Sequence, residues 1–136
     1  MLYPMFLMVL LTFLVGFFAV KARFSSVKKG KVSIKYFQLM DGKGIPETLT
    51  KTTRNFNNQF EVPVLFYVVC CLYISLSIES SFALICAWIF VLLRGVHAYI
   101  HLTYNNIIHR MLAFWAGIIF VMILWGNLIV EHSLNG

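Results

Sequence analysis

Charged side chains are scarce in this sequence. Only 12% of its 136 residues are Asp, Glu, Lys or Arg, and 60% belong to the hydrophobic class. A water-soluble domain of this size buries only about 60–70% of the surface that its unfolded chain exposes, so it would leave much of that apolar surface in water. The composition therefore excludes a soluble globular domain, and the length allows one domain.

Cysteine is also rare, and its positions do not suggest chemistry. The three cysteines lie in apolar stretches, with no metal-ligand spacing and no activating base beside them: Cys70, Cys71 and Cys86. We interpret them as packing residues. Internal repeats and low-complexity tracts are absent as well, which excludes a repeat architecture.

What the sequence does have is four long apolar stretches: Met1–Val20, Val62–Ile78, Phe82–Leu93, which resumes past Arg94, and Met111–Val130. A bilayer core of about 30 Å needs roughly 20 such residues in a helix. An open sheet could not satisfy its backbone groups in lipid, so helices are favoured. The sequence therefore predicts an all-α integral membrane protein, a four-helix bundle with helices at about 3–22, 46–79, 82–104 and 108–130.

The first stretch could instead be a cleaved signal peptide, because the sequence at 19–22 loosely resembles a cleavage site. However, Met1–Phe18 lacks the positive n-region, and the apolar run is longer than a normal h-region. We therefore expect this stretch to be retained as the first helix.

Glycine and proline mark the start of the second helix. Residues 24–44 are expected to form a polar loop with three glycines: Gly30, Gly42 and Gly44. Pro46 suits a first helical position, and Glu47 adds negative charge to that first turn. Pro63 is expected to kink this long helix at the membrane surface.

Positive charge is concentrated in one segment. The net charge is +6, and most of the eleven basic side chains lie together: Lys21, Arg23, Lys28, Lys29, Lys31, Lys35, Lys43, Lys51 and Arg54. By the positive-inside rule we expect the 23–53 loop to face the cytoplasm and the N-terminus to face outward, across the inner membrane if the source is bacterial. These dispersed charges beside a membrane suit anionic lipid head groups better than nucleic acid.

Polar side chains at membrane depth are costly and are commonly functional. One group on the second helix has offsets of four and seven, which place it on one face: Arg54, Asn58 and Glu61. A second group on the third helix has offsets of three and seven: Arg94, His97 and His101. Arg110 begins the fourth helix on the same side, so we expect these residues to converge in the cytoplasmic leaflet.

Two interpretations of this convergence stay open. Arginine pairs with carboxylates and Glu61 with an ammonium group, so the set suits a small zwitterion with several carboxylates and an amine. Alternatively, Glu61 pairs with Arg94 and only ties the second and third helices together. A metal site is disfavoured, because His97 and His101 have no clear third ligand.

These residues resemble a known family, the membrane-associated proteins in eicosanoid and glutathione metabolism (MAPEG). The string Arg54-x-x-x-Asn58-x-x-Glu61, followed by Pro63, is similar to the family signature on its second helix. A second string is similar to the prostaglandin E synthase branch: Arg94-Gly-Val-His97, with Arg110 sixteen residues after Arg94. The tract Trp88–Trp125 resembles a bacterial or distant member.

The resemblance implies a homotrimer that binds glutathione between subunits near the cytoplasmic face. It implies these cofactor-binding residues: Arg54, Asn58, Glu61, Arg94, His97 and His101. Arg110 would be catalytic, since a neighbouring Arg lowers the pKa of a thiol from about 8.5. The thiolate would attack a lipophilic electrophile or reduce a lipid peroxide. Lys21 or Arg23 would supply the basic residue that the family has near the end of its first helix.

The sequence departs from the family pattern at two positions. His101 stands where the family commonly has Tyr, and Asn57 where the prostaglandin branch has Arg. Tyr104 is a possible substitute for the missing Tyr. A rival hypothesis is therefore a non-enzymatic membrane protein that binds glutathione or a lipid, or serves as a structural subunit. A small transporter is a weaker third hypothesis, because no helix is broken by Gly or Pro at mid-membrane.

Overall fold

The computed structural model describes residues 1–40 and 44–135, and within these ranges all regular structure is helical. The elements are α1 (Leu2–Lys28), α2 (Tyr36–Leu39), α3 (Glu47–Asn57), η1 (Asn58–Phe60), α4 (Val62–Ser75), α5 (Ser81–Leu102) and α6 (Ile107–Asn135). Four segments of the described chain are long and apolar enough to span a membrane: Leu2–Lys28, Glu47–Ser75, Ser81–Leu102 and Ile107–Leu134. The predicted all-α fold with four spanning helices is confirmed.

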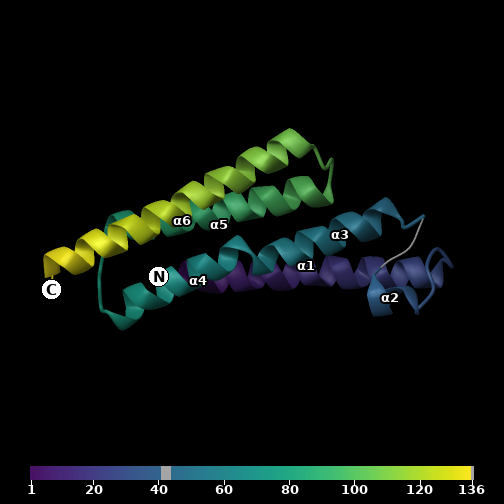
Figure 1. Ribbon diagram of the computed structural model, residues 1–136, viewed down its shortest axis with the longest axis horizontal. Coiled ribbons are helices and arrows are strands. Elements are labelled where there is room, and N and C mark those ends of the chain that lie inside the picture. Colours follow the sequence, from purple (N-terminus) through teal and green to yellow (C-terminus); the bar gives the residue numbers. More distant parts are fainter. Residues whose placement is uncertain (41–43, 136) are drawn as a thin grey trace.

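The bundle consists of two pairs of helices (Figure 1). In one pair, α1 lies beside the segment formed by α3 and α4, and in the other α5 lies beside α6. The α5–α6 turn, the end of α1 and the start of α3 all lie at the same end of the bundle, on the right in Figure 1. The two connections that we expect to face the cytoplasm are therefore on one side of the molecule.

Helix α1 is longer than the apolar run that predicted it. It continues past Ala22 to Lys28 and ends before Gly30, whose φ of +65° is the left-handed conformation common after helices. Lys, Arg and Ala are good helix formers, so the helix continues after the apolar residues stop. The first part of the expected polar loop is thus helical, and α2 adds one further turn. Gly42 and Lys43 lie outside the described residues.

The second span is interrupted rather than continuous. Its α-helical conformation ends at Asn57, a 3₁₀ turn follows, and Glu61 has non-helical angles of φ −99° and ψ −104° before α4 begins. Pro63 explains the position, because a proline lacks the N–H that would bond the Gln59 carbonyl one turn earlier. The kink expected at Pro63 is thus an interruption that precedes the proline. This span also has the lowest mean hydropathy of the four.

The other boundaries shift by a few residues. Helix α4 ends at Ser75, earlier than expected, and Ser77 adopts a left-handed φ of 53°. The backbone N–H of Ala83 donates to Ser80 Oγ (3.3 Å), which caps α5. Helix α6 extends past Val130 as far as Asn135. Hydropathy locates the apolar part of a helix but not the turns beyond it.

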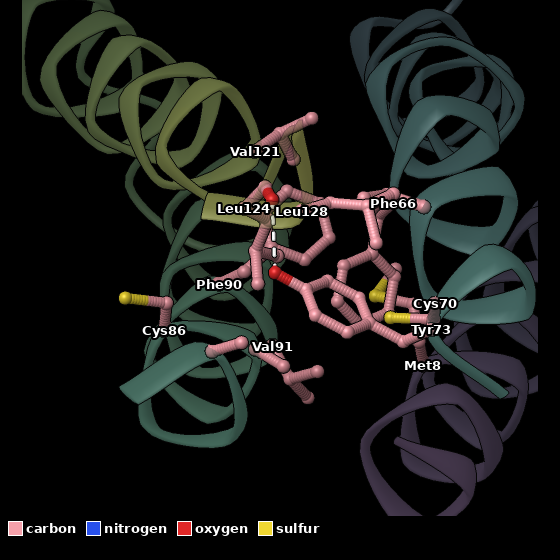
Figure 2. Close-up of a cluster of buried hydrophobic side chains, with 13 residues drawn as sticks. Met8, Phe66, Cys70, Tyr73, Cys86, Phe90, Val91, Val121, Leu124 and Leu128 are labelled. Atoms are coloured by element: carbon pink, nitrogen blue, oxygen red, sulfur yellow. Dashed lines mark hydrogen bonds between the residues drawn. The ribbon is translucent and has the colours of Figure 1, made fainter. Parts of the chain in front are cut away.

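The apolar core lies between α4, α5 and α6, and Met8 of α1 joins it (Figure 2). Phe66 and Phe90 stack with their ring centroids 4.4 Å apart. The Tyr73 hydroxyl points to α6, where the carbonyl of Leu124 (3.2 Å) and Oδ1 of Asn127 (2.8 Å) accept from it. Asn127, the one strongly polar side chain in the apolar run Met111–Val130, thus has the buried Tyr73 as its partner.

The cysteines only partly behave as predicted. Cys70 and Cys86 are buried in this core, which confirms them as packing residues. Cys71 is exposed on the outer surface of the subunit, so its interpretation as a packing residue is wrong within one chain.

Candidate functional site

The polar residues of α5 point into the bundle. Arg94, His97 and His101 are 0%, 2% and 2% exposed, respectively, so the face predicted from their spacing is an inner face. Long polar side chains buried at this depth require hydrogen-bond partners. The partners of Arg94 and His97 come from the second span and from α6.

Arg94 is bonded to the interruption of the second span. Its Nη2 donates to the backbone carbonyl of Asn58 at 2.8 Å. Asn58 begins the 3₁₀ turn, where carbonyls leave the regular pattern of the α-helix. The guanidinium therefore binds the backbone at the point where the helix is broken.

His97 continues this network from Asn58 to Arg110. Its Nδ1 lies 3.1 Å from the backbone carbonyl of Arg110, and its Nε2 lies 3.4 Å from Nδ2 of Asn58. A carbonyl only accepts, so Nδ1 carries the proton, and Nε2 accepts from the Asn58 amide. A neutral imidazole satisfies both contacts. The structure thus brings together Asn58, Arg94, His97 and Arg110.

Arg110 is half-buried in the first turn of α6. Its Nη1 donates to Oδ1 of Asn105 at 2.7 Å. Asn105 lies in the α5–α6 turn and was not singled out in the sequence. Two adjacent asparagines in a short turn between helices are the signal that would have drawn attention to it, because Asn is a common residue at helix ends.

Arg54 and Glu61 do not join this network. Both side chains are exposed, and in the described part of the chain neither forms a hydrogen bond or ion pair with Arg94, His97 or Arg110. The predicted single face assumed a continuous helix, and the interruption before α4 changes the direction of Glu61. Among the described residues no direct ion pair joins Glu61 to Arg94, so the alternative in which this pair ties the second and third helices together is not supported.

Two buried neutral amides lie on the second span, and one of them, Asn55, ties it to α5. Asn55 and Gln59 are 0% and 2% exposed. Nδ2 of Asn55 donates to the Ala98 carbonyl (3.4 Å), and Nε2 of Gln59 donates to the Asn55 carbonyl (3.3 Å). Their spacing of four residues on α3 and η1 is the same signal that singled out Arg54 and Asn58, so the sequence contained it.

Several buried polar atoms have no partner in the described structure. They include Nε and Nη1 of Arg94, Nδ1 of His101, Oδ1 of Asn55 and Oε1 of Gln59. The interior at this end of the bundle is thus rich in unused donors and acceptors. Tyr104, the possible substitute for the family Tyr, is exposed, and its hydroxyl pairs with Nδ1 of His109 at 3.1 Å.

The two basic residues near the end of the apolar part of α1 differ in their surroundings. Arg23 is half-buried, and its guanidinium carbon lies 6.0 Å from the ring centroid of Phe37. Lys21 is exposed and, with Lys51, lines a largely apolar groove of about 630 Å³ between α1, α3 and α5. Nζ of Lys51 donates to the Thr103 carbonyl at 3.2 Å. Lys21 is thus the more accessible of the two.

Four spanning helices with a buried cationic network at one end define a multi-pass integral membrane protein. The model of the MAPEG family matches residues 1–130, which is nearly the whole chain. The chain therefore belongs to the MAPEG family. No curated protein and no solved structure matches it. Among the described residues, no three His, Cys, Asp or Glu side chains gather where they could hold a metal ion.

Proposed function

We propose that this chain binds glutathione at the end of the bundle that carries Arg110. We propose further that it is a glutathione-dependent transferase or peroxidase acting on lipophilic electrophiles or lipid peroxides. One observation carries the proposal: a hydrogen-bonded network connects the second-span motif, at Asn58, with the guanidinium-bearing first turn of α6, at Arg110. Membership of the MAPEG family supports it.

The chemistry of the exposed residues fits this ligand. Glutathione carries two carboxylates, one ammonium group, two amide bonds and a thiol. Arg54 suits a carboxylate, Glu61 suits the ammonium group, and the Asn58 carboxamide offers both a donor and an acceptor. Because Arg54 and Glu61 are exposed on the subunit surface, a ligand held by them lies outside the bundle. A neighbouring copy in a homotrimer would cover it, and Lys21 is our choice for the basic residue that α1 contributes.

The buried residues then act from behind the ligand. Arg94 is inaccessible, and its contribution is to fix the Asn58 backbone. His97 fixes the Arg110 backbone, while the buried His101 supplies an unpartnered Nδ1 next to this layer. In this proposal some of the cofactor-binding residues touch glutathione, and the buried ones hold those residues in place.

Arg110 would act on the thiol. A free thiol has a pKa of about 8.5, and a guanidinium beside the sulfur favours the thiolate at neutral pH. In transfer, the thiolate forms a C–S bond with the electrophile, whose leaving atom takes the electron pair. In peroxide reduction, sulfur would attack the terminal peroxide oxygen, so that the O–O bond breaks, the hydroxyl stays on sulfur and the alcohol leaves after taking a proton. The thiol of a second glutathione would then displace that hydroxyl as water and form the disulfide.

The test is a titration of the purified protein in detergent with glutathione, followed by thiolate absorbance. We expect a thiolate signal at neutral pH in the wild type and none in Arg110→Ala. S-methylglutathione, which has no thiol, is the control for binding alone, and both proteins should bind it. If glutathione does not bind either protein at millimolar concentration, the proposal fails.

The alternative function is a non-enzymatic membrane protein that keeps the fold as a binding or structural subunit. The burial of Arg94 and His97 favours it, because their hydrogen bonds also hold the bundle together. The two departures from the family pattern, His101 and Asn57, also support this alternative. In that case glutathione binds without forming a thiolate, or does not bind.

A further inference from the structure

The backbone of Arg110 is held on two sides. Its N–H donates to the Asn106 carbonyl at 3.1 Å, within the first turn of α6. Its carbonyl accepts from Nδ1 of His97, also at 3.1 Å. The side chain of Arg110 is not fixed by these two bonds, and a long arginine side chain has many rotamers available to it.

Asn105 restricts that side chain. Its Oδ1 accepts from Nη1 of Arg110 at 2.7 Å, in the range of a short charge-assisted hydrogen bond. Asn105 is itself fixed, because its backbone N–H donates to the Ile100 carbonyl at 2.8 Å and its φ is 49°. Asn and Gly are the residues that adopt this left-handed conformation most readily, and only Asn also offers an acceptor.

The neighbouring asparagine has a different role. Oδ1 of Asn106 accepts from the backbone N–H of His109 at 3.1 Å and so caps α6. Asn106 makes no side-chain contact with the Arg110 guanidinium in the described structure. The two residues therefore separate helix capping from the contact to Arg110.

We propose that Asn105 is a positioning residue that holds the Arg110 guanidinium where it meets the glutathione sulfur. This inference rests on the proposed function. A carboxamide suits the role because it is neutral. It occupies one of the five guanidinium N–H groups and leaves the positive charge and the other N–H groups for an anion. A carboxylate at the same place would hold the arginine more strongly and offset its charge.

The test measures the pH dependence of the thiolate signal in the wild type, Asn105→Gly and Asn106→Gly. Glycine keeps the left-handed conformation at position 105 and removes only the carboxamide. We expect the thiolate pKa to rise by about one unit in Asn105→Gly, which is a tenfold loss of thiolate relative to thiol. The affinity for S-methylglutathione should stay within about twofold. The Asn105 carboxamide bonds only Arg110 and does not touch the peptide portion of the ligand. Asn106→Gly should lose thermal stability but keep the wild-type thiolate pKa.

Asn105→Asp is the second variant, and it keeps both the acceptor and the tolerance of a left-handed φ. Its carboxylate should raise the thiolate pKa further, while the affinity for S-methylglutathione stays unchanged.

A wild-type thiolate pKa in both Asn105→Gly and Asn105→Asp overturns the inference. Equal losses of thiolate and S-methylglutathione affinity also overturn it, because they indicate a loosened site. If the wild type forms no thiolate, the proposed function fails and this inference with it. If Arg110→Ala abolishes the signal but the Asn105 variants keep it, only this inference fails.

Discussion

His97 donates from Nδ1 to the backbone carbonyl of Arg110 across 3.1 Å, so α5 is bonded to the first turn of α6 by a side chain. The other nitrogen of the same ring accepts from Asn58. One imidazole therefore joins three membrane spans. Its removal would break two half-buried hydrogen bonds at once.

We expect His97→Phe to lower the free energy of unfolding by about 2–4 kcal/mol. Phenylalanine fills a similar volume but cannot bond the Asn58 amide or the Arg110 carbonyl, and each lost hydrogen bond costs about 1–2 kcal/mol. Thermal or denaturant unfolding in detergent measures the change. His132→Phe is the control, because His132 is exposed near the end of α6. A similar effect of the two substitutions would show that the network does not stabilise the bundle.

A second prediction concerns the exposed arginine of the second span. We expect Arg54→Ala to weaken glutathione binding about tenfold or more, since one charge-assisted hydrogen bond contributes about 1.5–3 kcal/mol. Lys28→Ala removes an exposed positive charge at the end of α1 and should have little effect. Isothermal titration with both variants at one salt concentration makes the comparison. Equal effects would place the ligand elsewhere.

The Tyr73–Asn127 contact gives a third prediction. Tyr73→Phe should lower stability by about 1–3 kcal/mol, because the half-buried Asn127 carboxamide then loses its partner, the buried Tyr73 hydroxyl. Adding Asn127→Leu should restore much of that loss, since both polar groups are then gone. Tyr99→Phe is the control, as Tyr99 is 65% exposed. Unfolding of the four proteins in one detergent tests this, and a double variant less stable than Tyr73→Phe alone would contradict the argument.

The sequence predicted the spans because long apolar runs match the thickness of the bilayer core and are rare in soluble domains. It predicted the inner face of α5 for a related reason: Arg94, His97 and His101 have a helical spacing, and α5 is uninterrupted. The same reasoning failed on the second span. There the 3₁₀ turn and the non-helical Glu61 change the angle between the Arg54 and Glu61 side chains around the helix axis. A helical wheel assumes a constant rotation of about 100° per residue.

The remaining site residues were missed because their roles depend on neighbours. Asn55 and Gln59 are neutral amides beside more conspicuous charges, and their contacts to α5 and within α3 appear only in the folded bundle. Asn105 acts on Arg110 through a turn whose geometry local spacing does not specify. Burial decides whether a polar residue can contact a ligand or can only position another residue that does. Hydropathy does not reveal the burial of polar side chains.

The low hydropathy of the second span also bears on how the protein is made. This span emerges from the ribosome after α1 but before α5, which carries the Ala98 carbonyl that pairs with Asn55. Arg54 and Glu61 lie near one end of this span, and the buried Asn55 amide has its partner on α5. A buried polar group without a partner is costly in the bilayer. The span's stable residence in the bilayer is therefore expected to depend on the later arrival of α5. Biosynthesis of this small protein would then be a concerted event of at least three spans rather than four independent insertions.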